Sequence, residues 1–398
     1  MCMSKSYDPK YKKKPKASKT SKTSKKPKTE ALKASVSLDV FSFANLNKAY
    51  KKARKGKRNQ DECIEFTLEL NQNLLKLEDE IKNRTYEIED YKTFEVTDPK
   101  KRTINALHFK DRVVQHVLCD EILAPLFEPK LIYDNAACRK GKGTLFALQR
   151  QTKFFSDYVK ENGLTGYVLK YDIRKYFDNI DHEILKEKLR TVIKDEGVLW
   201  LLDLIIDSYE TSPDKGLPLG NQTSQWFAVF YLDHMDKLIK ADIKRYSRYM
   251  DDGILLCNSK TKLNQTRTVM EDEAKKLSIE FNPKTQIFPI KNGVEYLGFR
   301  FSLNPTGKVI RRVKKGTKKR MKKRLKRLEE QLKAGEATEK DVEAICNSYN
   351  AHLKHGHAKS LRKQIRKTRA YIERQQERCH AFRLAYELLL ILGFLYSV

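Results

Sequence analysis

An acidic pair, Asp251-Asp252, interrupts the apolar stretch from Ser247 to Cys257. β-forming residues flank the pair on both sides, and the Asp-Gly step that ends at Gly253 is typical of a tight hairpin turn. The stretch therefore predicts two antiparallel strands with both carboxylates at or beside the tip of the hairpin. Adjacent carboxylates in a chain with a formal net charge of +29 indicate a site for a divalent metal ion.

A second segment supplies a third carboxylate. Residues Gly166 to Tyr171 form a short β-forming run, and Asp172 follows it directly. If this strand pairs with the hairpin, Asp172 meets Asp251 and Asp252, and three carboxylates can hold two Mg²⁺ ions roughly 3.5–4 Å apart. Such a pair of ions catalyses nucleotidyl transfer, since one activates a 3′-hydroxyl and the other stabilises the leaving pyrophosphate. A lone aspartate at a strand end is commonly structural, so this prediction requires the three carboxylates to meet.

Composition narrows the class of partner. The chain carries 81 Lys and Arg against 52 Asp and Glu. This balance favours a polyanion, foremost nucleic acid and less often an anionic membrane surface. Seven cysteines are scattered without a Cys-x-x-Cys pair, so neither a disulfide framework nor a thiolate zinc site is indicated, and a reducing, cytoplasmic setting fits.

The two ends of the chain differ from its centre. The first thirty residues hold eleven Lys and two acids, so residues 1–36 are expected to be a disordered basic tail, either a nucleic-acid-binding arm or a solubility tail. Residues 379–398 form an apolar end whose run from Leu388 is too short to cross a bilayer. We therefore expect no transmembrane segment, and interpret this end as a docked helix or, alternatively, a lipid-surface anchor.

Apolar spacing predicts helices on either side of a short strand. Between Leu38 and Tyr86 apolar residues recur at helical spacing, which is typical of packed amphipathic helices. Phe94 to Val96 is expected to form a strand, and Val113 to Leu123 another helix that Pro125 should end.

A strongly basic segment follows the centre. Residues 308 to 327 hold thirteen Lys or Arg and no acid. Apolar residues at helical spacing predict a basic helix there, which Gly335 can end, and Thr338 with Asp341 predicts a capping box for a second helix. Such helices neutralise nucleic-acid phosphates without reading sequence, although a solvated face is the simpler interpretation. Three histidines between 352 and 357 lack acidic or Cys neighbours, so a metal cluster is not expected there.

Several motifs occur in the order and spacing of a known polymerase family. They are the segments Phe109 to His116 and Asp134 to Thr144, Asp172 with Phe177, the loop Gly216 to Gln225, Tyr249 to Asp252, and Tyr296 to Phe299. Over roughly residues 40 to 301 the chain resembles a bacterial or phage reverse transcriptase. The resemblance implies an α+β, right-hand polymerase fold, with an antiparallel palm sheet flanked by helices. It assigns fingers to 37–165, palm to 166–301 with a motif helix at 216–240, and a helical thumb to 302–378.

The loop before the motif helix refines the resemblance. Most relatives have Gln-Gly and end the loop in Ser-Pro, whereas Leu219-Gly220 and Ser224-Gln225 resemble reverse transcriptases of diversity-generating retroelements. That type implies error-prone copying of a dedicated template RNA into cDNA, chiefly opposite template adenines, with a small basic accessory protein. The alternatives are a group II intron-like or phage-defence reverse transcriptase and, from another class, a non-catalytic RNA-binding maturase.

Residue roles follow from the matched motifs. Asp172, Asp251 and Asp252 would be the catalytic metal ligands, joined by the Ile173 carbonyl, for two Mg²⁺ ions or alternatively Mn²⁺. The deoxynucleotide would contact Arg102, Arg112, Phe177, Leu219, Gly220, Gln225 and Lys284. Template RNA and the RNA–cDNA hybrid would contact Tyr249, Met250, Tyr296, Leu297, Gly298, Arg311, Arg312, Lys318 and Lys319.

Four of these positions carry a specific expectation. Phe177 is expected to exclude a ribose 2′-hydroxyl, and Lys284 to protonate the departing pyrophosphate. Leu219 replaces a Gln and cannot make its polar contact, which should loosen nucleotide discrimination. Val229 stands where relatives tend to have Asn, so a polar template contact from that helix is not expected.

Overall fold

The computed structural model describes residues 36–97, 101–367, 369–370 and 374. The expectations for the basic tail up to residue 35 and for the apolar end 379–398 lie outside the described residues. The compact unit begins at Val36. Within the described residues, no helix is both long enough and apolar enough to span a membrane.

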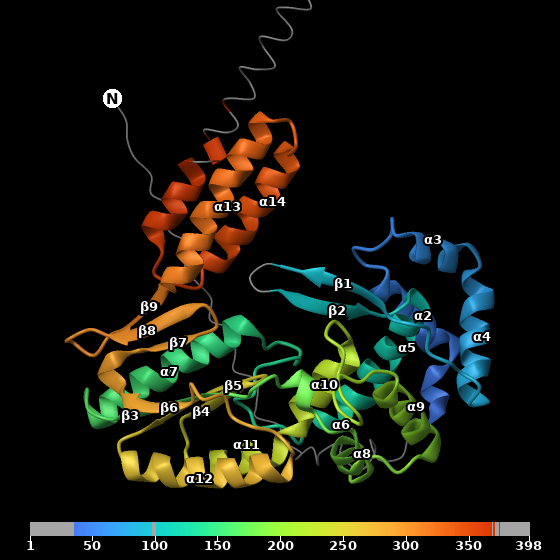
Figure 1. The fold of residues 1–398 in the computed structure, drawn as a ribbon, viewed down its shortest axis with the longest axis horizontal. Coiled ribbons are helices and arrows are strands. Elements are labelled where there is room, and N and C mark those ends of the chain that lie inside the picture. The colour runs from blue at the N-terminus through green and yellow to red at the C-terminus, as the bar shows by residue number, and fades with distance from the viewer. Residues whose placement is uncertain (1–35, 98–100, 368, 371–373, 375–398) are drawn as a thin grey trace, which may run out of the picture. The chain divides into compact units, whose positions relative to one another are not determined.

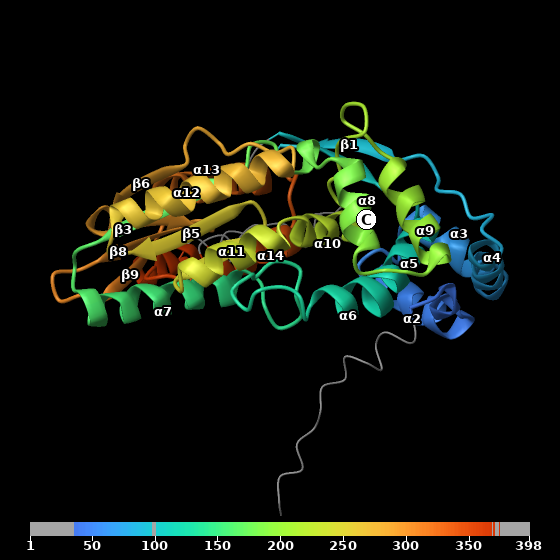
Figure 2. The same ribbon diagram turned by 90° about the horizontal axis from the view of Figure 1, so that it is seen from below.

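A four-stranded antiparallel sheet lies at the centre of the fold (Figure 1). Its strands are β3 (Tyr167–Asp172), β4 (Tyr246–Tyr249), β5 (Asp252–Cys257) and β6 (Gln286–Pro289), in the order β4-β5-β3-β6. Helix α7 (Thr144–Asn162) covers one face, and α11 (Asp233–Asp242) with α12 (Lys260–Lys276) lies on the other (Figure 2). The expected strands before Asp172 and around the acidic pair are therefore confirmed.

The core follows the alternation of side chains along these strands. Val168 and Ile254 pack in the cluster that includes α7, whereas their neighbours Leu169 and Leu255 pack in the cluster that includes α12. Successive residues of a strand point to opposite faces, and both faces are covered here by helices. This explains why the strands read as continuous apolar runs rather than as an alternating pattern.

Helices and one hairpin make up most of the rest of the chain up to Tyr231. Strand β1 (Lys92–Val96) pairs with β2 (Arg102–Ala106), so the expected strand at Phe94 to Val96 is confirmed. The surrounding helices are the 3₁₀ turn Leu38–Phe41, α2 (Phe43–Ala53), α3 (Asp61–Leu68), α4 (Leu70–Lys82), α8 (His182–Arg190), α9 (Glu196–Asp207) and α10 (Gln222–Tyr231).

One helix boundary differs from the prediction. Helix α5 (Phe109–Val117) continues through a π-helical turn (Leu118–Leu123) into α6 (Ala124–Phe127), so Pro125 does not end the helix. Pro125 lies in the first turn of α6, directly after the wider turn. A proline is tolerated in such a first turn because its N–H is not needed by the helical pattern.

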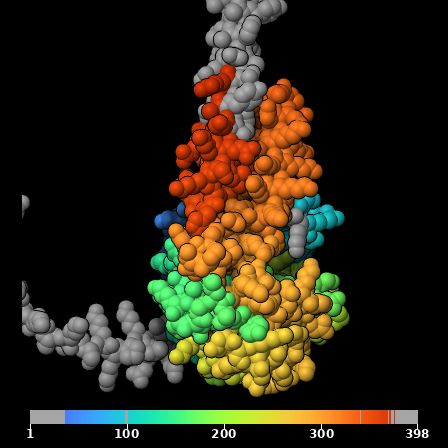
Figure 3. Space-filling view, turned by 90° about the vertical axis from the view of Figure 1, so that its left-hand side faces the viewer, coloured from blue at the N-terminus to red at the C-terminus, as the bar shows by residue number. Residues whose placement is uncertain are grey.

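A second sheet connects the central sheet to the C-terminal helices. Strands β7 (Val294–Tyr296), β8 (Phe299–Leu303) and β9 (Val309–Val313) pair in that order, and α13 (Lys315–Lys333) and α14 (Glu339–Leu353) follow. Figure 3 shows these helices above the sheet, with α7 and α12 below it. The basic segment 308–327, expected to be helical, thus begins with strand β9, and its helix α13 starts only at Lys315.

Helices α13 and α14 have the predicted ends and apolar face. Gly335, with φ 74°, follows α13, and Thr338 and Asp341 form a capping box at the start of α14. Met321 and Leu328 of α13 pack against Val342 and other residues of α14. The apolar stripe that the sequence predicted is therefore the packing surface between the two helices.

Candidate active site

The acidic pair lies at the tip of the β4–β5 hairpin. Tyr249 pairs with Asp252, so Met250 and Asp251 are the two turn residues, and Met250 has a φ of 55°. The turn precedes the Asp-Gly step that predicted it. Gly253 lies inside β5, and glycine is needed there for a reason other than the turn. A Cβ at this position would approach the Tyr171 ring to 2.3 Å. The position of the carboxylates is confirmed, and the role of Gly253 is corrected.

The third carboxylate lies directly opposite this tip. Asp172 ends β3 and pairs with Asp252 of β5. Burial raises the pKa of Asp251 to about 6, and the adjacent Asp172 adds to the rise. Burial likewise raises the pKa of Asp252 to about 7, with Asp172 and Asp251 adding to the rise against the opposing charge of Lys170. Like charges that share a buried site raise one another's pKa.

The donor set suits a hard divalent cation. Asp252 Oδ1 is buried and has no hydrogen-bond partner among the described residues, although Lys170 Nζ lies 3.5 Å away. Across the described residues, no three His, Cys, Asp or Glu side chains are arranged to hold a metal as they stand. Carboxylate oxygens are the ligands that Mg²⁺ prefers, and three carboxylate side chains meet at the tip of the hairpin.

The Ile173 carbonyl is placed as a further oxygen donor. Asp172 O accepts from Asn282 N–H at 2.7 Å, and Arg174 N–H donates to Glu280 O at 2.9 Å. These bonds flank the bridge between Ile173 and Phe281 and leave the carbonyl of Ile173 without a backbone donor among the described residues.

Arg248 holds the tip of the hairpin and was missed by sequence reasoning. Its side chain is fully buried and donates to both carboxylate oxygens of Asp236, at 2.8 and 2.7 Å. It also donates to Met250 O at 2.8 Å and to Val229 O at 2.9 Å. Burial opposes its charge, but Asp236 raises the pKa of Arg248 above its usual range. The turn that carries Asp251 is therefore tied to α10 and α11.

Two tyrosines complete this buried network. Tyr246 donates to Asp236 Oδ1 at 2.5 Å, and the hydroxyls of Tyr246 and Tyr171 lie 2.6 Å apart. Tyr171 stands next to Asp172 on β3, so the network joins the strands that carry the three carboxylates. The only sequence signal for it was a charged residue, Arg248, inside an apolar run, which indicates a buried ion pair.

A cavity of about 600 Å³ joins the β1–β2 hairpin to the motif loop. Lys101, Arg102 and Lys175 line it together with Leu219 and Tyr209. Asn105 N–H of β2 donates to Leu219 O at 3.3 Å, which attaches the hairpin to the loop. The structure thus brings Arg102 and Leu219 together, as expected for two nucleotide contacts.

Phe177 and the remaining loop residues lie elsewhere. Phe177 is half-buried at the start of a 3₁₀ turn and does not line the cavity of Arg102 and Leu219. Its main-chain carbonyl accepts from Leu217 N–H at 2.8 Å. Arg112, Gly220 and Gln225 line a separate cavity of about 290 Å³. Arg112 Nε donates to Leu107 O at 2.9 Å. The seven expected nucleotide contacts are therefore not gathered in one cavity.

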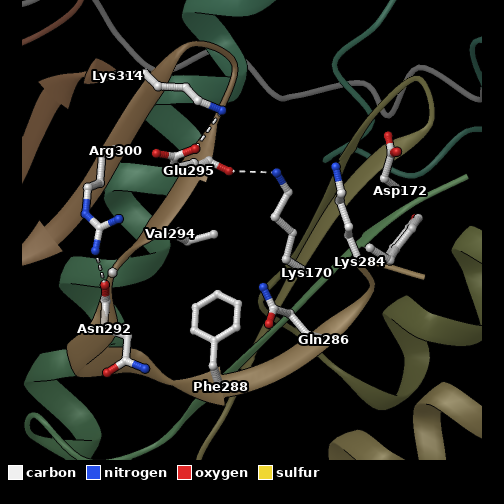
Figure 4. Close-up of a pocket in the computed structure, with 12 residues that line it drawn as sticks. Lys170, Asp172, Lys284, Gln286, Phe288, Asn292, Val294, Glu295, Arg300 and Lys314 are labelled. Atoms are coloured by element: carbon white, nitrogen blue, oxygen red, sulfur yellow. Dashed lines mark hydrogen bonds and ion pairs between the residues drawn. The ribbon is translucent and has the colours of Figure 1, made fainter. Parts of the chain in front are cut away.

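Lys284 lies in a third cavity, beside Asp172 (Figure 4). This cavity, of about 620 Å³, lies between the two sheets, and Lys170, Arg300 and Lys314 also line it. Lys170 donates to the main-chain carbonyl of Glu295 at 2.9 Å, and Lys314 contacts the Glu295 carboxylate at 2.6 Å. Positive charge is therefore concentrated between strand β3, which ends at Asp172, and strand β7.

The expected template and primer contacts lie in separate places, with Tyr249 and Met250 at the tip of the β4–β5 hairpin and the others in the β7–β9 sheet and on α13. Leu297 and Gly298, with φ of 46° and 83°, are the turn between β7 and β8, whereas Tyr296 is buried beneath it. Arg311 and Arg312 lie on β9 rather than on the basic helix, a correction that follows from the β8–β9 pairing. Lys318 and Lys319 are exposed on α13, as expected.

A histidine joins the thumb to this second sheet. His352 of α14 stacks on Phe299, with ring centroids 4.8 Å apart. His357 Nδ1 accepts from Arg311 N–H at 3.0 Å. These contacts position the thumb helices on the β7–β9 sheet, and the described residues offer no metal cluster here.

Comparison with known proteins decides the family. Residues 81–301 match the family model described as "Reverse transcriptase (RNA-dependent DNA polymerase)", which is more than half of the chain. The chain belongs to this family. The α+β expectation is confirmed with it, since the reverse transcriptase has the antiparallel sheet flanked by helices that the motifs implied.

Individual relatives are distant. The reverse transcriptase is 23% identical over 184 residues to the "Putative COX1/OXI3 intron 1 protein" of Saccharomyces cerevisiae, covering 44% of this chain and 21% of that protein. It is 13% identical, at a TM-score of 0.44, to apo telomerase of Candida tropicalis truncated from its C-terminal domain, covering 58% of each chain. Telomerase of Candida albicans in complex with a telomeric RNA fragment gives 12% identity and a TM-score of 0.43, over 58% of this chain and 46% of that one. This chain thus spans about a fifth of the curated relative's length.

Proposed function

We propose that this reverse transcriptase is an RNA-directed DNA polymerase that extends a primer on an RNA template with deoxynucleotides. The observation that carries the proposal is the pairing of Asp172 with Asp252 beside Asp251 at the hairpin tip. The family match supports it, because the matched residues 81–301 include all three aspartates.

The residues of the chain have distinct roles in this reaction. Asp172, Asp251 and Asp252, with the Ile173 carbonyl, would hold divalent cations, which supply charge stabilisation for phosphoryl transfer when bound. Arg248 holds the turn that carries Asp251. Lys101 and Arg102 line the cavity next to Leu219, where their charges would stabilise a triphosphate. Lys284, which lines the cavity beside Asp172, would protonate the leaving group.

We further propose that the enzyme serves a diversity-generating retroelement. Leu219, which replaces a polar residue, lines the cavity with Arg102, so the nucleotide would meet an aliphatic side chain there. Lost hydrogen bonding reduces discrimination between nucleotides. A cytoplasmic setting and a small basic accessory protein belong to the same proposal. The second candidate is an intron-associated reverse transcriptase, which similarity to the yeast "Putative COX1/OXI3 intron 1 protein" favours.

Primer extension tests the catalytic proposal. The full chain should extend a DNA primer on an RNA template with Mg²⁺ and deoxynucleotides. Asp251→Ala with Asp252→Ala should abolish extension, because the cation would lose most of its ligands. RNA affinity should stay within about twofold, since exposed Lys and Arg side chains, and not these buried carboxylates, bind the phosphates.

A matched control uses Asp272→Ala with Glu271→Ala on the outer helix α12, which should extend normally. Extension by the active-site double variant at the wild-type rate would refute the proposal. It would favour the RNA-binding maturase, in which the palm serves only as a scaffold.

A further inference from the structure

Lys170 is a cation in the candidate active site to which the proposed function assigns no role. It lies on β3 two residues before Asp172, so both side chains point to the same face of the sheet. The antiparallel register pairs Asp172 with Asp252. Lys170 pairs with Ile254, two residues further along β5, and is therefore the diagonal neighbour of Asp252, within reach of a long side chain. The register of β3 and β5 thus brings an ammonium group to the aspartates.

The structure places this ammonium group against one carboxylate. Lys170 Nζ lies 3.5 Å from Asp252 Oδ1, which is buried and has no hydrogen-bond partner among the described residues. In the part of the chain that the structure describes, no other Lys, Arg or His nitrogen lies within 4.0 Å of a carboxylate oxygen of the three aspartates. The guanidinium of Arg248 is paired with Asp236 instead. Lys170 is therefore the cation that offsets negative charge at the hairpin tip.

A second partner holds Lys170 from the other side of the cavity. Its Nζ donates to the main-chain carbonyl of Glu295 on β7 at 2.9 Å (Figure 4). The Glu295 carboxylate is paired with Lys314 at 2.6 Å, so the partner of Lys170 on this side is a neutral carbonyl. The hydrogen bond is made to this carbonyl, whereas the carboxylate of Asp252 is contacted only at the longer distance. Lys170 can therefore give up the carboxylate and keep its hydrogen bond.

We propose that Lys170 is a counter-ion of the metal site, which offsets the charge of Asp252 in the metal-free chain and yields this carboxylate to a divalent cation. The inference rests on the proposed function, in which the three aspartates hold divalent cations. Because two cations compete for one carboxylate, Lys170 lowers the affinity of the free enzyme for divalent ions. A triphosphate supplies further oxygen ligands, so the site would fill when the nucleotide arrives rather than before.

A purely structural role for Lys170 predicts a different change in metal affinity. If Lys170 only tied β3 to β7, its removal would loosen the strands that carry the aspartates, and metal binding would weaken or stay the same. Competition predicts tighter binding, because removing a positive charge beside a divalent cation removes repulsion. At a separation of about 5 Å near the protein surface, this repulsion corresponds to roughly tenfold in affinity. Lys170 is thus a positioning residue that acts through Asp252, and the direction of the change separates the two roles.

Titration of the full chain with Mn²⁺, without nucleotides or nucleic acid, tests the proposal without chemistry. Electron paramagnetic resonance measures free Mn²⁺, and binding at the site is the part that Asp251→Ala with Asp252→Ala removes. Lys170→Met should bind Mn²⁺ at this site about tenfold more tightly than the wild type. Lys170→Arg keeps the charge and should stay within about twofold of the wild type. The matched control Lys291→Met, at an exposed position in the 3₁₀ turn Ile290–Asn292, should do the same.

Urea denaturation gives a second readout. Without divalent ions, Lys170→Met should have a lower denaturation midpoint than the wild type, because the three carboxylates then repel one another without a counter-ion. Saturating Mg²⁺ should close most of this gap, since a cation that binds only the folded state stabilises it and replaces the missing charge. A structural tie between β3 and β7 would leave the gap independent of Mg²⁺. The same curves show whether Lys170→Met is folded under the conditions of the titration.

The inference is wrong if Lys170→Met binds Mn²⁺ no more tightly than the wild type, or if Mg²⁺ leaves the stability gap unchanged. Its failure is distinguishable from failure of the polymerase proposal. If the double aspartate variant removes Mn²⁺ binding but Lys170→Met does not tighten it, only the role of Lys170 is lost. If the double aspartate variant binds Mn²⁺ as the wild type does, the metal site itself is refuted, and both proposals fail.

Discussion

Leu219 is the residue on which the proposed infidelity depends. It lines the cavity of Arg102 and Lys101, and its carbonyl is held by Asn105 N–H, so its side chain has a defined position beside the expected nucleotide. Replacing it changes one contact without moving the loop. The consequence should therefore appear in the error spectrum rather than in folding.

Leu219→Gln should reduce misincorporation opposite template adenine, because an amide can form the polar contact that leucine cannot. The expected reduction is about 3–10-fold, the worth of one hydrogen bond. Sequencing of cDNA made on a defined RNA template measures it. Leu68→Gln, at a position 79% exposed on α3, is the matched control and should leave the spectrum unchanged. If Leu219→Gln gave the same error spectrum as the wild type, Leu219 would not be the cause of the infidelity.

A second prediction at the residue scale concerns the stability effect of replacing Gly253. Gly253→Ala places a methyl group 2.3 Å from the Tyr171 ring, inside a packed sheet, and should lower the free energy of unfolding by about 1–3 kcal/mol. Urea denaturation measures it. Gly316→Ala, where only the Arg320 side chain lies within 4 Å, is the control and should change stability by less than about 1 kcal/mol. Equal effects would show that the ring contact is not what requires glycine.

At the scale of elements, the β4–β5 hairpin depends on the two helices that precede it, α10 and α11. Arg248 on β4 is bonded to Asp236 of α11 and to the carbonyl of Val229 of α10. Val229, where a polar template contact was not expected, has its side chain fully buried in the core, and its carbonyl accepts from Arg248. The hairpin tip is thus positioned by an ion pair whose partner, Asp236, no local pattern in the sequence identifies.

Arg248→Met should lower the free energy of unfolding by about 3–5 kcal/mol, because it leaves the carboxylate of Asp236 buried and unpaired. Urea denaturation measures the loss. The control Arg267→Met removes a half-exposed pair with Glu271 on α12 and should cost less than about 1 kcal/mol. Adding Asp236→Leu to Arg248→Met should recover part of the stability, and failure to recover any would argue against the buried-charge explanation.

At the scale of the whole molecule, one buried acid links stability to pH. Asp111 is 1% exposed, and it accepts from the Tyr86 hydroxyl at 2.5 Å and from Glu89 N–H at 3.3 Å. Burial raises the pKa of Asp111 from 3.8 to about 6. Because the folded pKa lies above the unfolded value, the stabilising contribution is present below pH 3.8 and is lost as the pH rises through about 6.

Asp111→Asn, which stays neutral, should therefore gain stability relative to the wild type as the pH rises from about 4 to 6.5. The difference approaches about 3 kcal/mol at neutral pH, from a shift of about two pKa units. Urea denaturation across this pH range measures it. Asp79→Asn, at an exposed position on α4, should show no such trend. A pH-independent difference for Asp111→Asn would contradict the shift.

The sequence by itself determined the elements that local chemistry specifies. The β-forming runs at Tyr167–Asp172 and around Asp251, the capping box at Thr338 and the apolar stripe of α13 each depend on neighbouring residues, and each was predicted. The motif order also identified the family, because motif spacing is a property of the linear chain.

Only the tertiary structure decided how distant segments meet. The Arg248–Asp236 pair, the place of Gly253 under Tyr171, the strand β9, and the division of Arg102 and Arg112 between two cavities all involve contacts between elements far apart in the chain. Pairing and burial free energies depend on which surfaces come together. Composition and periodicity describe only the surface that each segment presents.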